Sequence, residues 1–174
     1  MERRMLVVRR DCPARLVPSG TRITIPRDTF VSLTQALGGS YTVNVGGNLA
    51  RVDGTDADAL GLEAVDLEFP PPTSDAVDAE QVWQALASIY DPEIPVNLVD
   101  LGLIYDCRID GQRVAITMTL TAPGCGMGPV LVDDVKYRVG KVPNVKEVTV
   151  ELVFDPPWSR ERMSEAAQLE LGIY

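Results

Sequence analysis

The stretch TAPGCGMGP, residues 121–129, combines a reactive side chain with an open backbone. Cys125 lies between Gly124 and Gly126, and Gly128 follows just before the closing proline. Glycine has no Cβ, so the backbone at these positions can approach a bulky or anionic group closely and offer it amide N–H donors. The residue types therefore predict a thiol-based site in this stretch.

The sequence on either side of this stretch indicates how Cys125 is positioned. RVAITMTL, residues 113–120, alternates as a strand does, and Pro129 suits the first turn of a helix. Ligands tend to bind at the carboxyl ends of strands, and the free N–H groups of a helix start stabilise an anion, so both favour thiolate over thiol. The residues leave one alternative open, in which the glycines only form a tight turn and Cys125 is a small buried side chain.

The absence of histidine narrows the chemistry. The chain of 174 residues contains no His and three cysteines, Cys12, Cys107 and Cys125. Catalysis by Ser-His-Asp or Cys-His arrangements and imidazole metal sites are therefore excluded. The cysteines form no CxxC pair, so neither a self-contained zinc site nor a dithiol redox site is expected. We expect Cys107 to be buried in an alternating strand, and nothing places Cys12 near Cys125.

Composition and charge exclude further classes of function. The net charge is −9 and the pI is near 4.5, which argues against binding to nucleic-acid phosphates. No apolar run approaches the roughly 18 residues that a membrane span needs. The N-terminal apolar run, Met5 to Val8, is too short for a signal peptide. We therefore expect a cytoplasmic protein that binds neither membranes nor nucleic acid.

A proline-rich segment, FPPPTSD at residues 69–75, predicts a linker between two domains. Residues 1–68, which precede it, contain short strand-like runs separated by glycine turns. This pattern predicts a small β-rich domain of barrel or roll type. Within it, Gly46 and Gly47 supply the conformations that the turn of a hairpin needs.

Residues 76–174 predict a second domain that mixes helices and strands. Apolar residues at helical spacing follow Asp78, a candidate helix cap, and Asp110-Gly111 separates two strand-like runs as in a hairpin. A third strand, KEVTVELVF, follows the helix after Pro129, and we expect a last helix to begin at Ser159. The order α-β-β-α-β-α implies a two-layer domain with one small mixed sheet, so the fold class of the whole chain is α+β.

Three motifs give the second domain a family resemblance. DPEIPVNLVDLGLIYD (91–106), TMTLTAPGCGMGPVL (117–131) and VFDPPWSRERMSE (153–165) resemble the metal–sulfur cluster biosynthesis family, to which SufT belongs. The N-terminal part, with RDCPARLVPSGT and TQALGGSYTV, looks like the longer bacterial SufT arrangement. The resemblance implies an iron–sulfur cluster assembly domain with a fold similar to the C-terminal domain of NifU-type scaffolds.

The resemblance also implies which residues form the site. In this family the cysteine that matches Cys125 is the functional thiol, implicated in cluster or iron handling, and the acidic residues that match Asp91 and Glu93 lie in the other signature loop. The residues expected to support the site are Asp91, Glu93, Asp100, Thr121, Gly124, Gly126 and Gly128. Aspartates before proline and at loop ends are also common turn and cap residues, so a turn role for the carboxylates stays open.

The function that the resemblance implies is iron–sulfur maturation without catalysis. Position 128 is Gly, so the loop lacks the CxxC of NifU-type scaffolds and one chain offers one ligand from it. A cluster usually takes four protein ligands. We therefore expect a labile, transient cluster or iron, a homodimer, and apo iron–sulfur client proteins and other cluster-assembly factors as partners. Two alternatives are a thiol enzyme that pairs Cys125 with a carboxylate base, and a client-binding adaptor with no cluster chemistry.

Overall fold

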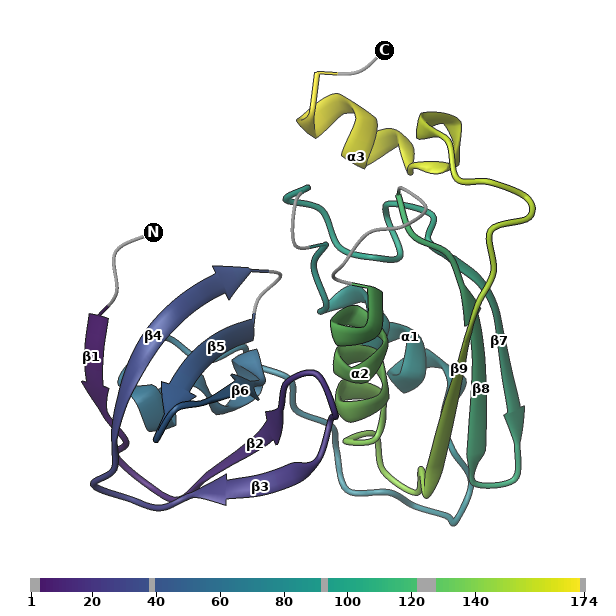
Figure 1. Ribbon diagram of the computed structural model, residues 1–174. Helices are drawn as coiled ribbons and strands as arrows, with labels where there is room; N and C mark the ends of the chain where they lie inside the picture. The colour runs from purple at the N-terminus through teal and green to yellow at the C-terminus, as the bar shows by residue number, and fades with distance from the viewer. Residues whose placement is uncertain (1–3, 38–39, 92–93, 122–127, 173–174) are drawn as a thin grey trace. The chain divides into compact units, whose positions relative to one another are not determined.

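The computed structural model describes residues 4–37, 40–91, 94–121 and 128–172 (Figure 1). The chain forms two compact units, Met1–Leu67 and Glu68–Tyr174, each with its own sheet. The sheet of the first unit is antiparallel and that of the second is mixed, which confirms the α+β class.

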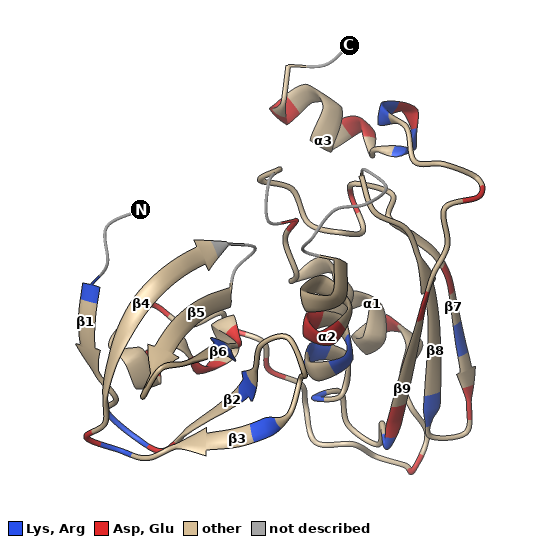
Figure 2. Ribbon diagram, in the orientation of Figure 1, with Lys and Arg blue, Asp and Glu red and all other residues tan. Residues whose placement is uncertain are grey.

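Charge is divided unequally between the two units (Figure 2). The first unit has eight arginines and eight acidic residues, whereas the second has eight basic and seventeen acidic residues. The first unit is therefore neutral overall, and the net charge of −9 belongs to the second unit. Such an excess attracts cations and repels the phosphates of nucleic acids. No helix in the described ranges has both the length and the apolar composition that crossing a membrane requires.

The first unit contains a six-stranded sheet in the order β1-β4-β5-β6-β2-β3. Gly46 and Gly47, with φ of 56° and 90°, form the turn between β5 and β6, as predicted. The strands are β1 Arg4–Val7, β2 Cys12–Leu16, β3 Arg22–Ile25, β4 Phe30–Leu37, β5 Ser40–Val45 and β6 Asn48–Val52.

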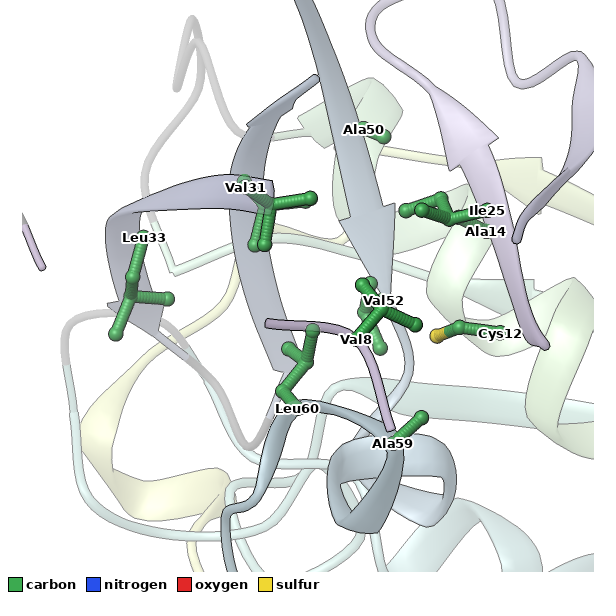
Figure 3. Close-up of a cluster of buried hydrophobic side chains, with 11 residues drawn as sticks. Val8, Cys12, Ala14, Ile25, Val31, Leu33, Ala50, Val52, Ala59 and Leu60 are labelled. Carbon is green, nitrogen blue, oxygen red and sulfur yellow. The ribbon is translucent and has the colours of Figure 1, made fainter. Parts of the chain in front are cut away.

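One face of this sheet carries the core of the first unit (Figure 3). Ala14 in β2, Val31 in β4 and Val43 in β5 belong to this buried cluster. A 3-10 helix, η1 (Gly54–Leu60), adds Ala59 and Leu60 to the cluster. Burial of these alternate apolar side chains holds the sheet and η1 together.

The second unit packs two helices against one side of a three-stranded sheet (Figure 1). β7 is antiparallel to β8, and β8 is parallel to β9. Val114, Ile116 and Met118 of β8 are buried, whereas Arg113 and Ala115 are exposed, so one face of the strand is covered. The elements are α1 Ala79–Ala87, β7 Ile104–Asp110, β8 Arg113–Met118, α2 Gly128–Val139, β9 Glu147–Leu152, the 3-10 helix η2 Arg160–Arg162 and α3 Glu165–Glu170.

Both ends of α1 have polar partners. At its start, Asp78 Oδ1 accepts a hydrogen bond from Glu80 N at 2.9 Å, so the predicted cap is confirmed. At its end, Arg138 Nη1 of α2 donates to Ser88 O at 2.8 Å. A cation at the negative end of a helix is favourable, so this contact joins α2 to α1.

The expected start of the last helix at Ser159 is wrong. Ser159 makes no side-chain capping bond, and only the short η2 follows it. Met163 is then extended and buried, and α3 begins after Ser164, whose Oγ accepts a hydrogen bond from Ala167 N. The chain leaves helical geometry at Met163, and the local sequence pattern does not show this.

Candidate functional site

The thiol-containing stretch connects the end of β8 to the start of α2. β8 ends at Met118, and α2 begins at Gly128, one residue before its expected start at Pro129. The predicted site residues that lie outside the described ranges are Glu93, Gly124, Cys125 and Gly126. The structure thus describes the two ends of the predicted site, and the role of Cys125 stays a prediction.

Gly128 allows the first turn of α2 to lie close to the segment that leaves β8. It is buried, and a Cβ built on it would lie 3.0 Å from Leu120 Cδ1 and 3.9 Å from Leu152 Cδ1. A larger residue would press on Leu120, so glycine brings the helix start nearest to the strand end. Thr121, at the other described end of the loop, is half-buried.

Asp91 and Asp100 each organise a turn. Asp91 is buried, and its Oδ1 accepts a hydrogen bond from Ile94 N at 2.9 Å. Asp100 Oδ2 accepts from Asn97 Nδ2 at 2.7 Å, and Asp100 N donates to Asn97 Oδ1 at 2.9 Å. These are contacts of turn-forming aspartates. Among the residues that the structure describes, no three His, Cys, Asp or Glu side chains are grouped to hold a metal ion. A metal role for either carboxylate therefore stays a prediction.

The C-terminal segment, which we define as residues 155–164, folds back onto the turn that contains Asp100. Ser164 N donates to Asp100 O at 2.7 Å. Trp158 Nε1 donates to Leu101 O at 2.6 Å. The partners are far apart in the chain, so no local pattern marks these contacts. The C-terminal segment thereby holds the turn at Asp100 and Leu101 in place.

Gly102 is a point of close approach between this turn and the C-terminal segment. Its φ is 76°, and a Cβ built on it would overlap the Arg162 carbonyl oxygen. Nearby, Tyr105 Oη donates to Pro156 O at 2.8 Å, and the Arg162 guanidinium lies 4.7 Å from the centre of the Tyr105 ring. Glycine at position 102 therefore permits the segment to dock.

Thr119 is a residue at this end of the sheet that the sequence reasoning missed. It is fully buried, and its Oγ1 has no hydrogen-bond partner among the described residues. Its backbone N donates to Leu103 O at 2.9 Å, so sheet pairing continues beyond the end of β8. In the sequence, its burial is indicated only by its position between two apolar residues, Met118 and Leu120.

Burial disfavours the thiolate form of both described cysteines. Cys12 of β2 lies in the core of the first unit (Figure 3), and burial raises its pKa to about 11. Cys107 of β7 is half-buried, and burial raises its pKa, with Asp106 adding to the effect. The expectation of a buried Cys107 is thus only partly met, because β7 is an edge strand of the three-stranded sheet.

We expect Cys12 and Cys107 to react slowly with iodoacetamide at neutral pH in the folded protein. Alkylation requires thiolate, and a raised pKa lowers the thiolate fraction. Mass spectrometry of the modified peptides should show both rates rising with pH, with Cys12 requiring the higher pH. Denatured protein is the control, in which both thiols should react readily. A Cys107 that is modified as fast in the folded as in the denatured protein would contradict the structure.

One hollow of the second unit lies away from the described ends of the thiol-containing stretch. It has a volume of about 650 Å³ and surrounds Gly111, Gln112 and Lys146, at the hairpin between β7 and β8. This is the amino end of β8, opposite to Met118.

Comparison with known proteins links the second unit to iron–sulfur assembly. Residues 79–152 match a family described as "Iron-sulfur cluster assembly protein". The chain is 50% identical over 95 residues to a "Fe-S protein maturation auxiliary factor" of Porphyromonas gingivalis, covering 54% of this chain and 90% of the relative. It is 38% identical over 86 residues to the "Fe-S protein maturation auxiliary factor SufT" of Staphylococcus aureus, covering 49% of this chain and 98% of that protein.

A solved structure shares the fold of the matched part. The crystal structure of a "Domain of Unknown Function DUF59" from Bacillus anthracis has 43% sequence identity and a TM-score of 0.52. The similarity covers 55% of this chain and 92% of that domain. The family match contains Asp91, Asp100 and both described ends of the thiol-containing stretch.

Proposed function

The chain belongs to the iron–sulfur cluster assembly protein family, and from this premise we propose that it is a maturation factor that assists delivery of clusters to apo-proteins. The observation that carries the proposal is that two curated maturation factors align with this chain over 90% and 98% of their lengths. Most of the length of these relatives is therefore represented in this chain. We further propose that the protein acts as an auxiliary factor or carrier and not as an enzyme, since the chain has no His to serve as a general base.

We propose Cys125 as the thiol that binds the cargo, an iron–sulfur cluster or iron held transiently. Its stretch joins a strand end to a helix start, and amides at a helix start stabilise a thiolate. Soft thiolate ligands suit iron–sulfur clusters. Cys12 and Cys107, with raised pKa values, are poorer candidates. The negative charge of the second unit, which attracts cations, also agrees with iron as cargo.

The supply of one thiol per loop determines the proposed partners. A cluster that takes four ligands needs a homodimer, a client or an assembly factor to complete its coordination. A cluster held in this way is labile, which favours transfer over storage. We propose that residues 76–174 form the cluster domain, with a fold like the C-terminal domain of NifU-type scaffolds, and that residues 69–75 link it to the β-rich domain 1–68.

The proposal is tested in cells that lack this gene and grow under iron limitation. We expect the wild-type gene to restore the activity of iron–sulfur enzymes, and Cys125→Ser to fail at comparable protein levels. Cys12→Ala is the matched thiol control and should restore activity whenever the protein accumulates. The activity of an enzyme that contains no cluster should be the same in all of these cells. Normal iron–sulfur enzyme activity in cells without the gene would contradict the proposed function.

A further inference from the structure

An exposed apolar patch lies on the outer face of the first unit's sheet. We define the β1 patch as Met5, Val7 and Phe30, which are 67%, 43% and 69% exposed. Val7 of β1 is the cross-strand partner of Phe30 of β4, so these side chains are neighbours on one face. Leu6 and Val8 alternate with them and face the core. Large apolar side chains gathered in this way commonly mark an interaction surface.

The backbone of β1 also presents positions for strand pairing. β1 is an edge strand of the sheet, with β4 on one side (Figure 1). Val8 N donates to Thr29 O, and Asp28 N donates to Val8 O at 2.7 Å, so the Val8 backbone groups point toward β4. That direction alternates along a strand, so the N–H and C=O groups of Met5 and Val7 point toward the open edge. A further strand can therefore pair with β1 through these two residues.

β1 is complementary to a second copy of itself in an antiparallel register centred on Leu6. Met5 of each copy then lies opposite Val7 of the other, and these are the residues whose backbone groups face the edge. Arg4 lies opposite Val8, so no like charges are opposed. Met5 and Val7 of the two copies form cross-strand apolar pairs, which stabilise a sheet. The two β1 patches thereby join across the seam.

The other edge strands of the two described sheets are β3, β7 and β9, and they suit pairing with themselves poorly. Full antiparallel pairing of β9 with itself opposes Glu147 and Glu151 of the two copies. The same pairing of β7 opposes Asp106 and Asp110. Like charges directly opposite each other destabilise a sheet. β3 has the exposed Arg22 and no exposed large apolar side chain, so β1 is the edge that favours a second copy.

The distribution of charge also favours contact through the first unit. The first unit is neutral overall, whereas the second unit carries the net charge of −9. Two second units therefore repel each other, and two neutral first units do not. Arg4, at the start of β1, is the one charged residue of this strand (Figure 2). A second copy of the chain is thus the partner whose charge and side chains fit the β1 edge.

We propose that the protein forms a two-fold symmetric homodimer through antiparallel pairing of β1 with β1 of a second copy, centred on Leu6. This inference rests on the homodimer of the proposed function and identifies the surface that joins its two copies. A two-fold axis requires the same surface on both copies, as this register provides. The pairing unites the six-stranded sheets of the two copies into one and gives the first unit a role in assembly.

Disulfide crosslinking of the full chain tests the register. The Leu6 residues of the two copies form a non-hydrogen-bonded pair, with Cα atoms about 4.5 Å apart. That spacing permits a disulfide, so we expect Leu6→Cys to form a covalent dimer under mild oxidation, seen on non-reducing gels. Val7→Cys is the matched control, because its two copies lie diagonally, about 8 Å apart, and should crosslink far less. Equal crosslinking of the two variants, above that of the wild type or not, would overturn the inference.

Sedimentation equilibrium of the full chain tests the contact itself. We expect the wild type to dimerise and Val7→Lys to raise the Kd of the dimer by more than about tenfold, because lysine on an edge strand opposes strand pairing. Leu49→Lys is the matched control, since Leu49 is 42% exposed in β6, an inner strand of the sheet. Its Kd should equal that of the wild type. Circular dichroism confirms that each variant is folded.

The contrary results are distinct from a failure of the proposed function. A monomeric wild type, or an unchanged Kd in Val7→Lys, would overturn the inference. An equal rise of Kd in Leu49→Lys would place the contact on the sheet face and not at the β1 edge, and would overturn it as well. Cluster delivery with a client or assembly factor would remain, because the activity of iron–sulfur enzymes in cells is measured separately.

Discussion

Replacing Gly102 by alanine is expected to lower the free energy of unfolding of the second unit by about 3 kcal/mol or more. Alanine at a φ of 76° is strained, and its Cβ would overlap the Arg162 carbonyl oxygen. The C-terminal segment must then move, which breaks the bonds that its Trp158 and Ser164 make to the backbone oxygens of Leu101 and Asp100. Urea unfolding followed by tryptophan fluorescence reports this loss, since both tryptophans, Trp83 and Trp158, lie in the second unit.

Gly111→Ala is the matched control for this change. Gly111 also has a positive φ, 60°, but no atom lies within 4 Å of a Cβ built there. We therefore expect Gly111→Ala to lower the free energy of unfolding only by the cost of placing alanine in the left-handed conformation, about 1 kcal/mol. Equal losses in the two variants would show that docking of the C-terminal segment does not depend on Gly102.

Cys125→Ser is expected to reduce the iron and sulfide bound after anaerobic reconstitution by more than about tenfold. Serine replaces a soft thiolate by a hydroxyl, which is a poor ligand for clusters. Absorbance spectra and chemical assays of iron and sulfide measure the loss. The urea midpoint of the second unit should change little. Wild-type levels of bound iron in Cys125→Ser would contradict the role proposed for this thiol.

Cys107→Ser is the control for the loss of a thiol as such. Cys107 lies half-buried in β7, so a serine hydroxyl there is partly removed from water. An unpaired buried hydroxyl costs roughly 1–3 kcal/mol, and partial exposure places this site at the lower end. We expect a lower urea midpoint with unchanged binding of iron and sulfide, the reverse of the pattern for Cys125→Ser.

The parts of the fold that local sequence determines were predictable. Asp78 caps α1 because its side chain satisfies a free N–H in the first turn, and Gly46-Gly47 and Gly111 adopt the positive φ that their turns need. Alternation of apolar residues gave β8 its buried face and β9 a half-buried one. The thiol-containing stretch was correctly assigned to the connection between β8 and α2, because alternation marks the strand before it and Pro129 marks the helix start after it.

Features that depend on contacts between distant parts of the chain were not predictable. The last helix begins at Glu165 and not at Ser159, after the buried, extended Met163 and the capping residue Ser164. Likewise, Trp158 bonds to Leu101, and no spacing rule connects those two positions. The unpaired hydroxyl of Thr119 is visible only once its neighbours are placed in three dimensions.

The most direct test of the proposed function is transfer of a cluster to an apo-protein. The protein is reconstituted anaerobically with isotopically labelled iron and sulfide, freed of excess reagents, and mixed with an apo-ferredoxin. We expect labelled clusters to appear in the ferredoxin faster than with the same amounts of free iron and sulfide, and Cys125→Ser to give no such acceleration. Transfer no faster than with free iron and sulfide would contradict the account.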